Sequence, residues 1–170
     1  MSATIGSMNT SAGGDGAAGL PEIPGDPLEL ERQVCFALSV AARSVLSIYR
    51  PLLEPMGLTH PQYLVMLALW QHAPLSVRGL SELLQLDPGT LSPLLKRLEA
   101  VGYLRRDRAP ADERSLAVTL TPTGTALRAR AEQIPPAVVE RLQLPIADLR
   151  RLHAALTEVI AAAQPAPTPA

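Results

Sequence analysis

The chain has one cysteine, Cys35, and a thiol is a side chain that can do redox or nucleophilic chemistry. A thiolate is a nucleophile that peroxides oxidise to a sulfenic acid, and a chain without a second cysteine cannot then close an internal disulfide. A lone cysteine can equally be a small, inert residue packed in a core. The sequence therefore leaves two roles open for Cys35, an oxidisable thiol and a packed side chain.

Catalysis by Cys35 would need further groups, and His60, His72 and His153 are the available bases. No glycine-flanked nucleophile turn, oxyanion-hole motif or resolving cysteine accompanies them in the sequence. The spacing of cysteine and histidine matches no metal site. We therefore expect no enzyme activity, no cofactor and no metal centre.

A second candidate site lies in residues 87–98, where short polar side chains precede two basic ones. A recognition helix enters the major groove of DNA with its N-terminus first, so small donors belong in its first turns and cations farther along, near phosphates. The residues expected to contact DNA or to shape this helix are Asp87, Gly89, Thr90, Ser92, Lys96 and Arg97.

Positive charge gathers just beyond this segment, although the whole chain carries a net charge of −1. Of the seven basic residues between positions 76 and 121, five lie between Arg97 and Arg114. Arg108 and Arg114 bracket a hydrophilic loop from which an arginine can enter a narrow minor groove, and Asp112 would orient one of them by pairing. The alternative is that these charges only form a solvated face.

Hydrophobic spacing predicts the helices that precede these residues. Between Leu28 and Tyr49, apolar residues recur at intervals of three and four, which predicts a long helix that begins near Pro27. Thr59 and Gln62 form a capping box for a second helix, which ends near residue 72. Because aromatic residues are only 3% of the chain, aliphatic side chains must form the core, and this favours helices.

The segment 76–102 is predicted to be a helix-turn-helix. Ser76 caps a short helix that ends near Leu84, and Asp87 followed by Pro88 starts the next helix, which Gly102 ends. A short helix, a brief break and a second helix are typical of this motif.

A hairpin, or wing, should follow it, with strands over 103–108 and 115–120. Thr121 and Pro122 then start a helix that Pro135-Pro136 should break, and residues 146–163 predict a last amphipathic helix. The longest apolar run in the helical region, 64–70, is too short to span a bilayer, and residues 1–26 lack the features of a signal peptide. A cytoplasmic location is therefore expected.

The segments 112–115 and 120–124, with the sequences DERS and LTPTG, resemble the wing and exit signature of the MarR family of bacterial transcription regulators. The resemblance runs from about Leu30 to Ala163. The stretches 33–38, 49–53, 58–67 and 89–99 are similar to the organic-hydroperoxide-sensing OhrR branch of that family.

This resemblance implies a mainly α-helical fold with a small β-hairpin, a winged helix-turn-helix that dimerises through its N- and C-terminal helices. The implied layout is a MarR-type domain at 27–163, with dimerisation helices at 27–54 and 122–163, a DNA-binding lobe at 59–121, and disordered tails at 1–26 and 164–170.

The resemblance also implies a homodimeric repressor of a pseudo-palindromic operator in double-stranded DNA, released when an organic hydroperoxide oxidises Cys35. Tyr49 matches a tyrosine that hydrogen-bonds the thiolate in this branch, and His60 stands where a second tyrosine is expected. Fourteen residues of helix separate Cys35 from Tyr49 by about 21 Å, so such a contact must cross a dimer interface. Ser39 replaces an aromatic residue that often follows the cysteine. With these two departures, the thiol switch could be either retained or retuned.

Simpler roles remain open for both partner residues. Tyr49 could be an interface anchor with its hydroxyl in water, and His60 could be a solvent-exposed residue at a helix start. The oxidised thiol could form a mixed disulfide with a low-molecular-weight thiol, a sulfenamide, an overoxidised acid or a bridge between two Cys35 residues; the mixed disulfide is favoured for its bulk. In the alternative function, a small aromatic ligand in the dimer cleft releases DNA and Cys35 is structural.

Overall fold

The structure, a computed structural model, describes residues 26, 28–109 and 112–163, without the side chains of residues 108, 109 and 112–115. The expected tails therefore lie outside the described residues, apart from Asp26. The described residues fall into two units that divide between Val40 and Ala41.

In the first unit, a 3-10 turn η1 (Leu30–Arg32) precedes the start of helix α1 (Val34–Leu53). The expectation of a helix from Pro27 was wrong, because Gln33 takes an extended conformation, with φ −75° and ψ 120°, that separates the two helical segments. Cys35 is consequently the second residue of α1 and lies in its first turn.

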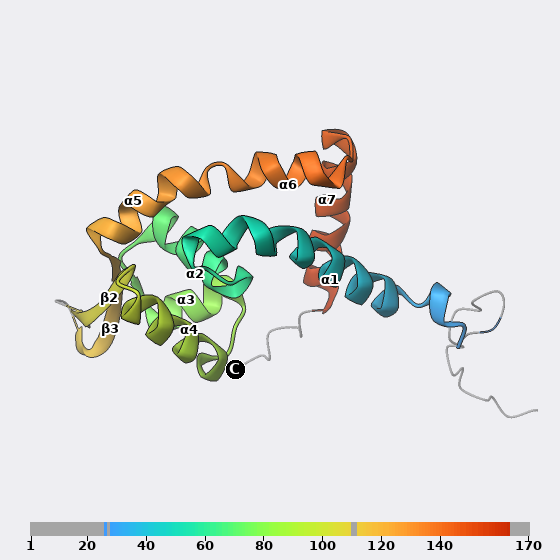
Figure 1. The fold of residues 1–170 in the computed structure, drawn as a ribbon. Helices are drawn as coiled ribbons and strands as arrows, with labels where there is room; N and C mark the ends of the chain where they lie inside the picture. The colour runs from blue at the N-terminus through green and yellow to red at the C-terminus, as the bar shows by residue number, and fades with distance from the viewer. Residues whose placement is uncertain (1–25, 27, 110–111, 164–170) are drawn as a thin grey trace, which may run out of the picture. The chain divides into compact units, whose positions relative to one another are not determined.

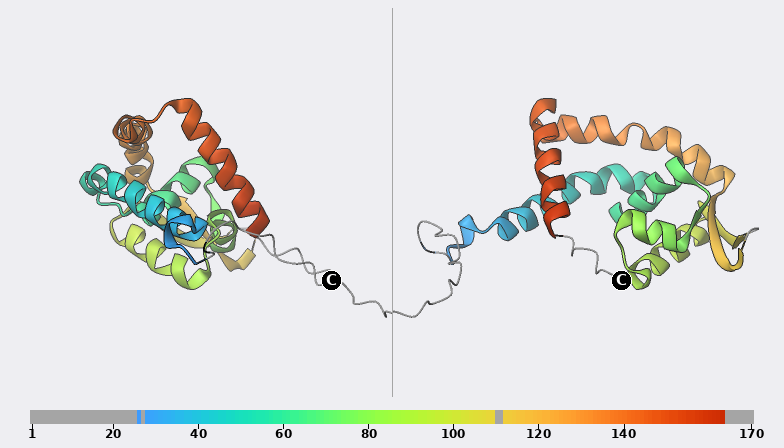
Figure 2. Two further views of the ribbon diagram at one scale, coloured as in Figure 1. Left: turned by 90° about the vertical axis from the view of Figure 1, so that its right-hand side faces the viewer. Right: turned by 180° about the vertical axis from the view of Figure 1, so that it is seen from behind.

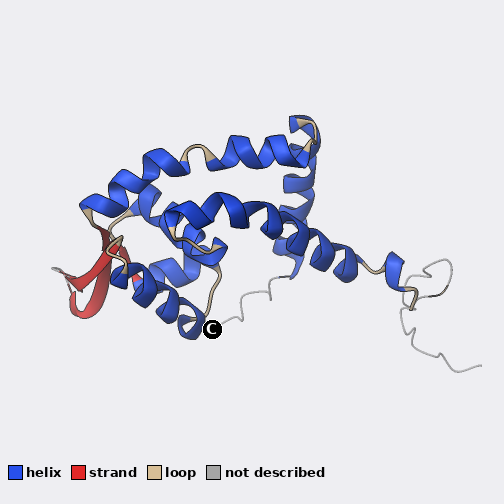
Figure 3. Ribbon diagram, in the orientation of Figure 1, coloured by secondary structure: helices blue, strands red, loops and turns tan. Residues whose placement is uncertain are grey.

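The second unit begins within α1 and is mainly helical, with all of its strands gathered at one end (Figures 1 and 3). After α1 it contains η2 (Glu54–Met56), α2 (His60–His72), β1 (Leu75–Ser76), α3 (Val77–Leu84), α4 (Pro88–Ala100), β2 (Leu104–Ala109), β3 (Asp112–Leu120), α5 (Pro122–Ala131), α6 (Ile134–Leu142) and α7 (Ile146–Ala163).

Side-chain caps start the helices where the sequence predicted them. The side-chain oxygen of Gln62 accepts hydrogen bonds from the N–H and the hydroxyl of Thr59 before α2. Ser76 and Asp87 accept from backbone N–H groups in the first turns of α3 and α4, at 2.9 Å each. The helix-turn-helix is thus confirmed, and Gly102, with φ +78°, follows α4 in the left-handed conformation that suits glycine.

The predicted hairpin is part of a three-stranded antiparallel sheet with the order β1-β3-β2. Strand β1 was not predicted because its two residues, Leu75 and Ser76, become a strand only by pairing with Val118 and Ala117 of β3. The hairpin itself extends farther than predicted, since β2 and β3 continue into the segment expected to be a loop. Figure 1 shows the hairpin projecting beyond α3 and α4.

Pro135-Pro136 was expected to break the helix that starts at Pro122, but that helix, α5, already ends at Ala131, and a further helix, α6, was not predicted. The two prolines lie in the first turn of α6, where a missing N–H costs no hydrogen bond. Figure 2 shows from behind that α5 and α6 follow one another and that α7 then turns away. The core of this unit is aliphatic and includes Leu53, Met66, Leu80, Leu91, Leu95, Leu98, Leu104, Val118, Leu127 and Val138.

One stretch of the described chain, Val34–Met56, is long and apolar enough to cross a membrane by length and composition alone, with a mean hydropathy of 1.2. The sequence argument missed it because it weighed only continuous apolar runs. Arg43 and Arg50 lie within the stretch, and arginine is costly inside a bilayer. Helices that pack against protein have the same composition, so the stretch is weak grounds for a membrane span.

Gly124, in the first turn of α5, is the described glycine that another part of the backbone approaches most closely. A Cβ atom built there would overlap the carbonyl oxygen of Tyr103, and the Gly124 carbonyl accepts a hydrogen bond of 2.9 Å from the indole Nε1 of Trp70. We therefore expect Gly124→Ala to lower the free energy of unfolding by about 1–3 kcal/mol through overpacking, as measured by urea denaturation. Thr123→Ala, at an exposed neighbouring position, is the control; equal stability of the two variants would contradict the prediction.

Candidate functional site

Helix α4 presents one buried face and one exposed face. Leu91, Leu95 and Leu98 are almost completely buried and hold the helix against the core. The predicted DNA-contacting residues Gly89, Thr90, Ser92, Lys96 and Arg97 all fall on exposed positions of the same helix. The apolar spacing that seats α4 therefore leaves its short polar and basic side chains in solvent.

The N-terminus of α4 is closed by Asp87 and Thr90. One carboxylate oxygen of Asp87 accepts from the Thr90 N–H at 2.9 Å, and the other accepts from the Thr90 hydroxyl at 2.6 Å. These hydrogen bonds, the one from the hydroxyl first, lower the pKa of Asp87. The Thr90 hydroxyl therefore donates its hydrogen bond to the carboxylate of Asp87, and Asp87 caps the helix in its ionised form.

The basic side chains of α4 and the wing differ in whether an acidic side chain already pairs with them. Lys96 and Arg97 are exposed and form no ion pair with the described residues. Arg105 is exposed but pairs with Asp107 at 2.8 Å and donates from Nε to the Thr119 hydroxyl at 3.1 Å. The side chains of Arg108, Asp112 and Arg114 lie outside the described residues, so their roles in the wing stay predictions.

The interaction that sequence reasoning missed joins α4 to the wing. Both side chains are half-buried: Glu99, in the last turn of α4, accepts hydrogen bonds from the backbone N–H and the guanidinium of Arg106 in β2. Sequence counting placed Arg106 among the wing's positive charges. The available signal was a glutamate just before the helix-ending Gly102, followed by an arginine within the next strand.

In the first unit, Cys35 is a free thiol on an exposed residue. The single chain therefore does not pack it in a core. Ser39, one turn farther along α1, donates its hydroxyl to the carbonyl oxygen of Cys35 at 2.8 Å. The Ser39 hydroxyl is thereby satisfied by the backbone rather than by the thiol.

In the second unit, Tyr49 of α1 and His60 of α2 form an edge-to-face pair with ring centroids 5.0 Å apart. Burial raises the pKa of Tyr49 and lowers the pKa of His60, because it disfavours the phenolate and the imidazolium. Both rings are half-buried, so His60 is not simply an exposed residue at the start of α2. The structure thus brings together two of the three residues assigned to the thiol site and keeps both uncharged near neutral pH.

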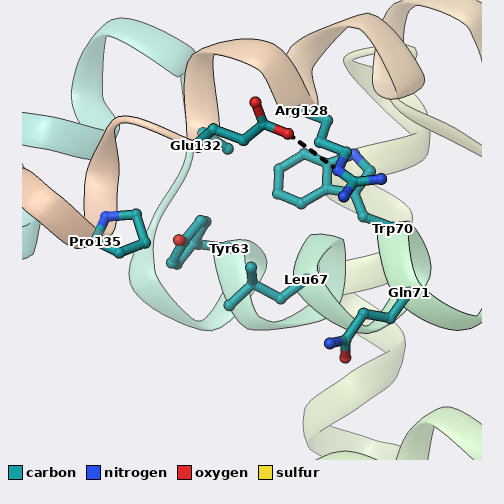
Figure 4. Close-up of a pocket in the computed structure, with 8 residues that line it drawn as sticks. Tyr63, Leu67, Trp70, Gln71, Arg128, Glu132 and Pro135 are labelled. Carbon is teal, nitrogen blue, oxygen red and sulfur yellow. Dashed lines mark ion pairs between the residues drawn. The ribbon is translucent and has the colours of Figure 1, made fainter.

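The aromatic contacts continue along α2 to a cavity of about 300 Å³ between α2 and the α5–α6 segment (Figure 4). The ring of Tyr63 lies 6.1 Å from that of Tyr49 and 6.4 Å from that of Trp70, measured between centroids. Tyr63 and Trp70 line the cavity together with Arg128, whose guanidinium pairs with Glu132 at 3.5 Å. The cavity is mostly apolar, and the charged residues of its lining are the paired Arg128 and Glu132.

Known proteins share this architecture. The family model named MarR family matches residues 58–116, from the start of α2 into β3. The organic hydroperoxide resistance transcriptional regulator of Bacillus subtilis is 41% identical over 131 residues, which cover 77% of this chain and 89% of that protein.

Solved structures agree with this assignment. Reduced AbfR bound to DNA is 32% identical, with a TM-score of 0.64, and the alignment covers 78% of this chain and 92% of that one. Disulfide-formed AbfR is 31% identical, with a TM-score of 0.56 and coverage of 78% and 88%. The transcriptional repressor CouR, bound to a 23-mer DNA duplex, is 28% identical, with a TM-score of 0.69 and coverage of 78% and 94%.

The winged helix-turn-helix, the aliphatic core beneath α4 and the extent of these similarities lead to one assignment. The chain belongs to the MarR family of DNA-binding transcriptional regulators.

Proposed function

We propose that this regulator is a homodimeric repressor that releases its operator when an organic hydroperoxide oxidises Cys35. The observation that carries the proposal is that the only thiol of the chain is exposed and lies in the first turn of a helix. A helix N-terminus favours negative charge in that turn. The similarity to an organic hydroperoxide resistance regulator supports the choice of oxidant. Such a protein would act in the cytoplasm, where its operator lies.

The proposed chemistry needs two steps at one sulfur. The thiolate attacks the peroxide oxygen, which gives a sulfenic acid and releases the alcohol formed from the hydroperoxide. A low-molecular-weight thiol then condenses with the sulfenic acid, so that an S–S bond forms and water leaves. With one cysteine per chain, this mixed disulfide is the proposed end product.

DNA reading is assigned to α4 and the wing. Exposed Ser92, Lys96 and Arg97 would face the major groove and its phosphates, with Asp87 and Gly89 shaping the start of the helix. Arg108 and Arg114 would reach the minor groove from the wing, with Asp112 as an orienting partner. The DNA-bound structures of AbfR and CouR support this assignment.

A second copy of the chain is the proposed cover for apolar side chains that the single chain leaves in solvent. In the first unit, Val34 is 67% exposed; in the second unit, Leu152 and Ile160 of α7 are 51% and 49% exposed. Apolar surface on several helices is typical of an obligate interface. We further propose that Tyr49 and His60 of one protomer meet Cys35 of the other across this interface.

The cavity beside Tyr63 and Trp70 favours a second candidate function, release of DNA by a small aromatic ligand. A mostly apolar lining that includes the rings of Tyr63 and Trp70 suits a planar aromatic ligand. In this alternative Cys35 is structural. The two functions differ in their response to reductant, since ligand-driven release should survive it.

The thiol proposal predicts that Cys35→Ser binds DNA as the wild type does but ignores tert-butyl hydroperoxide. The measurement is fluorescence anisotropy of a labelled duplex that the wild-type protein selects from a random library. Intact mass with and without free cysteine should show the mixed disulfide on the wild type alone. Ser39→Ala is the matched control and should keep the peroxide response, because its hydroxyl bonds a backbone carbonyl.

Release of Cys35→Ser at the same peroxide concentration as the wild type would refute the thiol switch. If benzoate instead releases the wild type in the presence of excess reductant, the ligand-binding candidate is supported.

The burial of His60 predicts a specific pH dependence of stability. Because its pKa in the folded chain is lowered from 6.5, the unfolded chain takes up the proton first as the pH falls. The stability that a neutral His60 allows is therefore present above about pH 6.5 and decreases below it. Urea unfolding at pH 7.5 and 5.5 should show a larger loss for the wild type than for His60→Gln.

His72→Gln, at an exposed position at the end of α2, is the control and should follow the wild type. Parallel losses for wild type and His60→Gln would show that His60 is not held neutral by burial.

The dimer proposal predicts that Leu152→Glu shifts the protein toward monomer in sedimentation velocity. A charge on an interface side chain loses its solvation, and one winged lobe holds an operator less tightly than two, so affinity should fall by about tenfold or more. His153→Glu, an exposed polar position on the same helix, should remain dimeric. A Leu152→Glu protein that stays dimeric would exclude α7 from the interface.

A further inference from the structure

The link between Glu99 and Arg106 is the most buried ion pair among the described residues. The two side chains are 35% and 26% exposed, whereas the pair of Arg78 and Glu82 is 89% and 65% exposed. One Glu99 oxygen accepts from the Arg106 backbone N–H at 3.0 Å, and the other accepts from Nε at 3.0 Å and from Nη2 at 2.5 Å. Three charge-assisted hydrogen bonds thus converge on one carboxylate.

This carboxylate serves an otherwise open edge of the sheet. The strand order β1-β3-β2 leaves β2 with a partner on one side only. Arg106 lies opposite Val118 of β3, and its N–H donates to Glu99. Glu99 therefore occupies the edge position that a fourth strand would take, and it does so from the last turn of α4.

Apart from the pairing with β3, the other contacts that tie β2 to α4 and the core lie at the start of the strand. The N–H groups of Gly102 and Tyr103 bond the carbonyls of Glu99 and Leu98, which sets the turn after α4. The side chain of Leu104 is buried in the core. Arg106 is two residues farther toward the wing tip, and within the described side chains it is the outermost residue of β2 that hydrogen-bonds to α4.

The charges at this point cancel. The hydrogen bond from the Arg106 side chain is the main cause that lowers the pKa of Glu99, so the pair stays ionised at neutral pH. The positive charge of Arg106 is therefore paired with Glu99 and is not available to a phosphate. Lys96, Arg97 and Arg105 remain the exposed cations of the described α4 and β2 segments.

We propose that Glu99 is a positioning residue for DNA binding: it clamps the wing strand to the recognition helix, so that groove-reading groups on both elements meet the duplex in one fixed relation. The inference rests on the DNA-binding function proposed above and adds a residue that touches no DNA itself. This proposal and a purely electrostatic model predict opposite effects of removing the charge of Glu99. By electrostatics alone, DNA binding should become stronger when an acidic charge beside the DNA is removed, whereas loss of the clamp should weaken it.

The test compares Glu99→Gln with the wild type on the selected duplex. We expect affinity to fall by about tenfold, the equivalent of one lost charge-assisted clamp. The slope of log K against log salt should be unchanged, because no phosphate contact is removed. Glu82→Gln in α3 makes the same charge change at an exposed pair of the same lobe and should bind as tightly as the wild type or tighter.

Arg106 variants complete the test. Arg106→Gln should lose as much affinity as Glu99→Gln, and the double variant should lose no more than either, because both break one interaction. Arg106→Lys keeps the positive charge but lacks the planar guanidinium that donates two hydrogen bonds, so its affinity for the duplex should lie between those of the wild type and Arg106→Gln. If Glu99→Gln fails to fold, Glu99→Asp, which keeps the charge on a shorter side chain, takes its place with the same expected loss.

Two results would overturn the inference while leaving DNA binding intact. One is unchanged or tighter binding by a folded Glu99→Gln. The other is a salt slope reduced by about one in Arg106→Gln alone, which identifies Arg106 as a phosphate contact. A wild-type protein that selects no duplex refutes the proposed function, and the inference with it.

Discussion

The close approach of Gly124 to Tyr103 is the constraint on which the DNA-binding lobe depends. At this point the chain leaves the wing and meets the turn that follows α4, and only a residue without Cβ fits. Hydrogen bonds surround the contact: Thr121 donates its N–H to the Tyr103 carbonyl at 3.1 Å and its hydroxyl to the Gly102 carbonyl, and the Tyr103 hydroxyl reaches the Met56 carbonyl at 2.8 Å. Helix α4, both wing strands and the start of α5 are thereby fixed to one another at a single node.

Local signals in the sequence were sufficient for the helices that a side-chain cap starts. The caps at Ser76, Asp87 and Thr121 place α3, α4 and α5, because side-chain caps act over three residues. Strand β1 was missed because its two residues become a strand only by pairing with residues about forty positions away. Helix α6 was missed for a different reason: Pro135-Pro136 was interpreted as a break, although prolines suit a first helical turn.

The candidate sites were predicted unevenly for the same reason. Exposure of Thr90, Lys96 and Arg97 follows from the leucine spacing of α4, which is local. Whether a basic side chain forms an ion pair does not follow from its spacing in the sequence, because ion pairing depends on the tertiary structure. Arg106 is matched by Glu99, so the positive charge available for DNA is smaller than a count of arginines indicates. The DNA reading proposed for this protein would then depend on the placement of few cations rather than on a strong field.

The aromatic row gives the two candidate sites a physical connection within the second unit. It runs through Tyr49, His60, Tyr63 and Trp70, and the indole of Trp70 donates to Gly124 at the node that fixes the wing. Packed rings transmit a displacement only if they have two alternative arrangements, and a signal shifts an equilibrium only by the difference in free energy with which it favours one of them. A change at Tyr49 and His60 would therefore alter DNA binding only if it favours a different placement of the Trp70 ring. Such a placement would remove the hydrogen bond that the carbonyl oxygen of Gly124 now accepts from the indole.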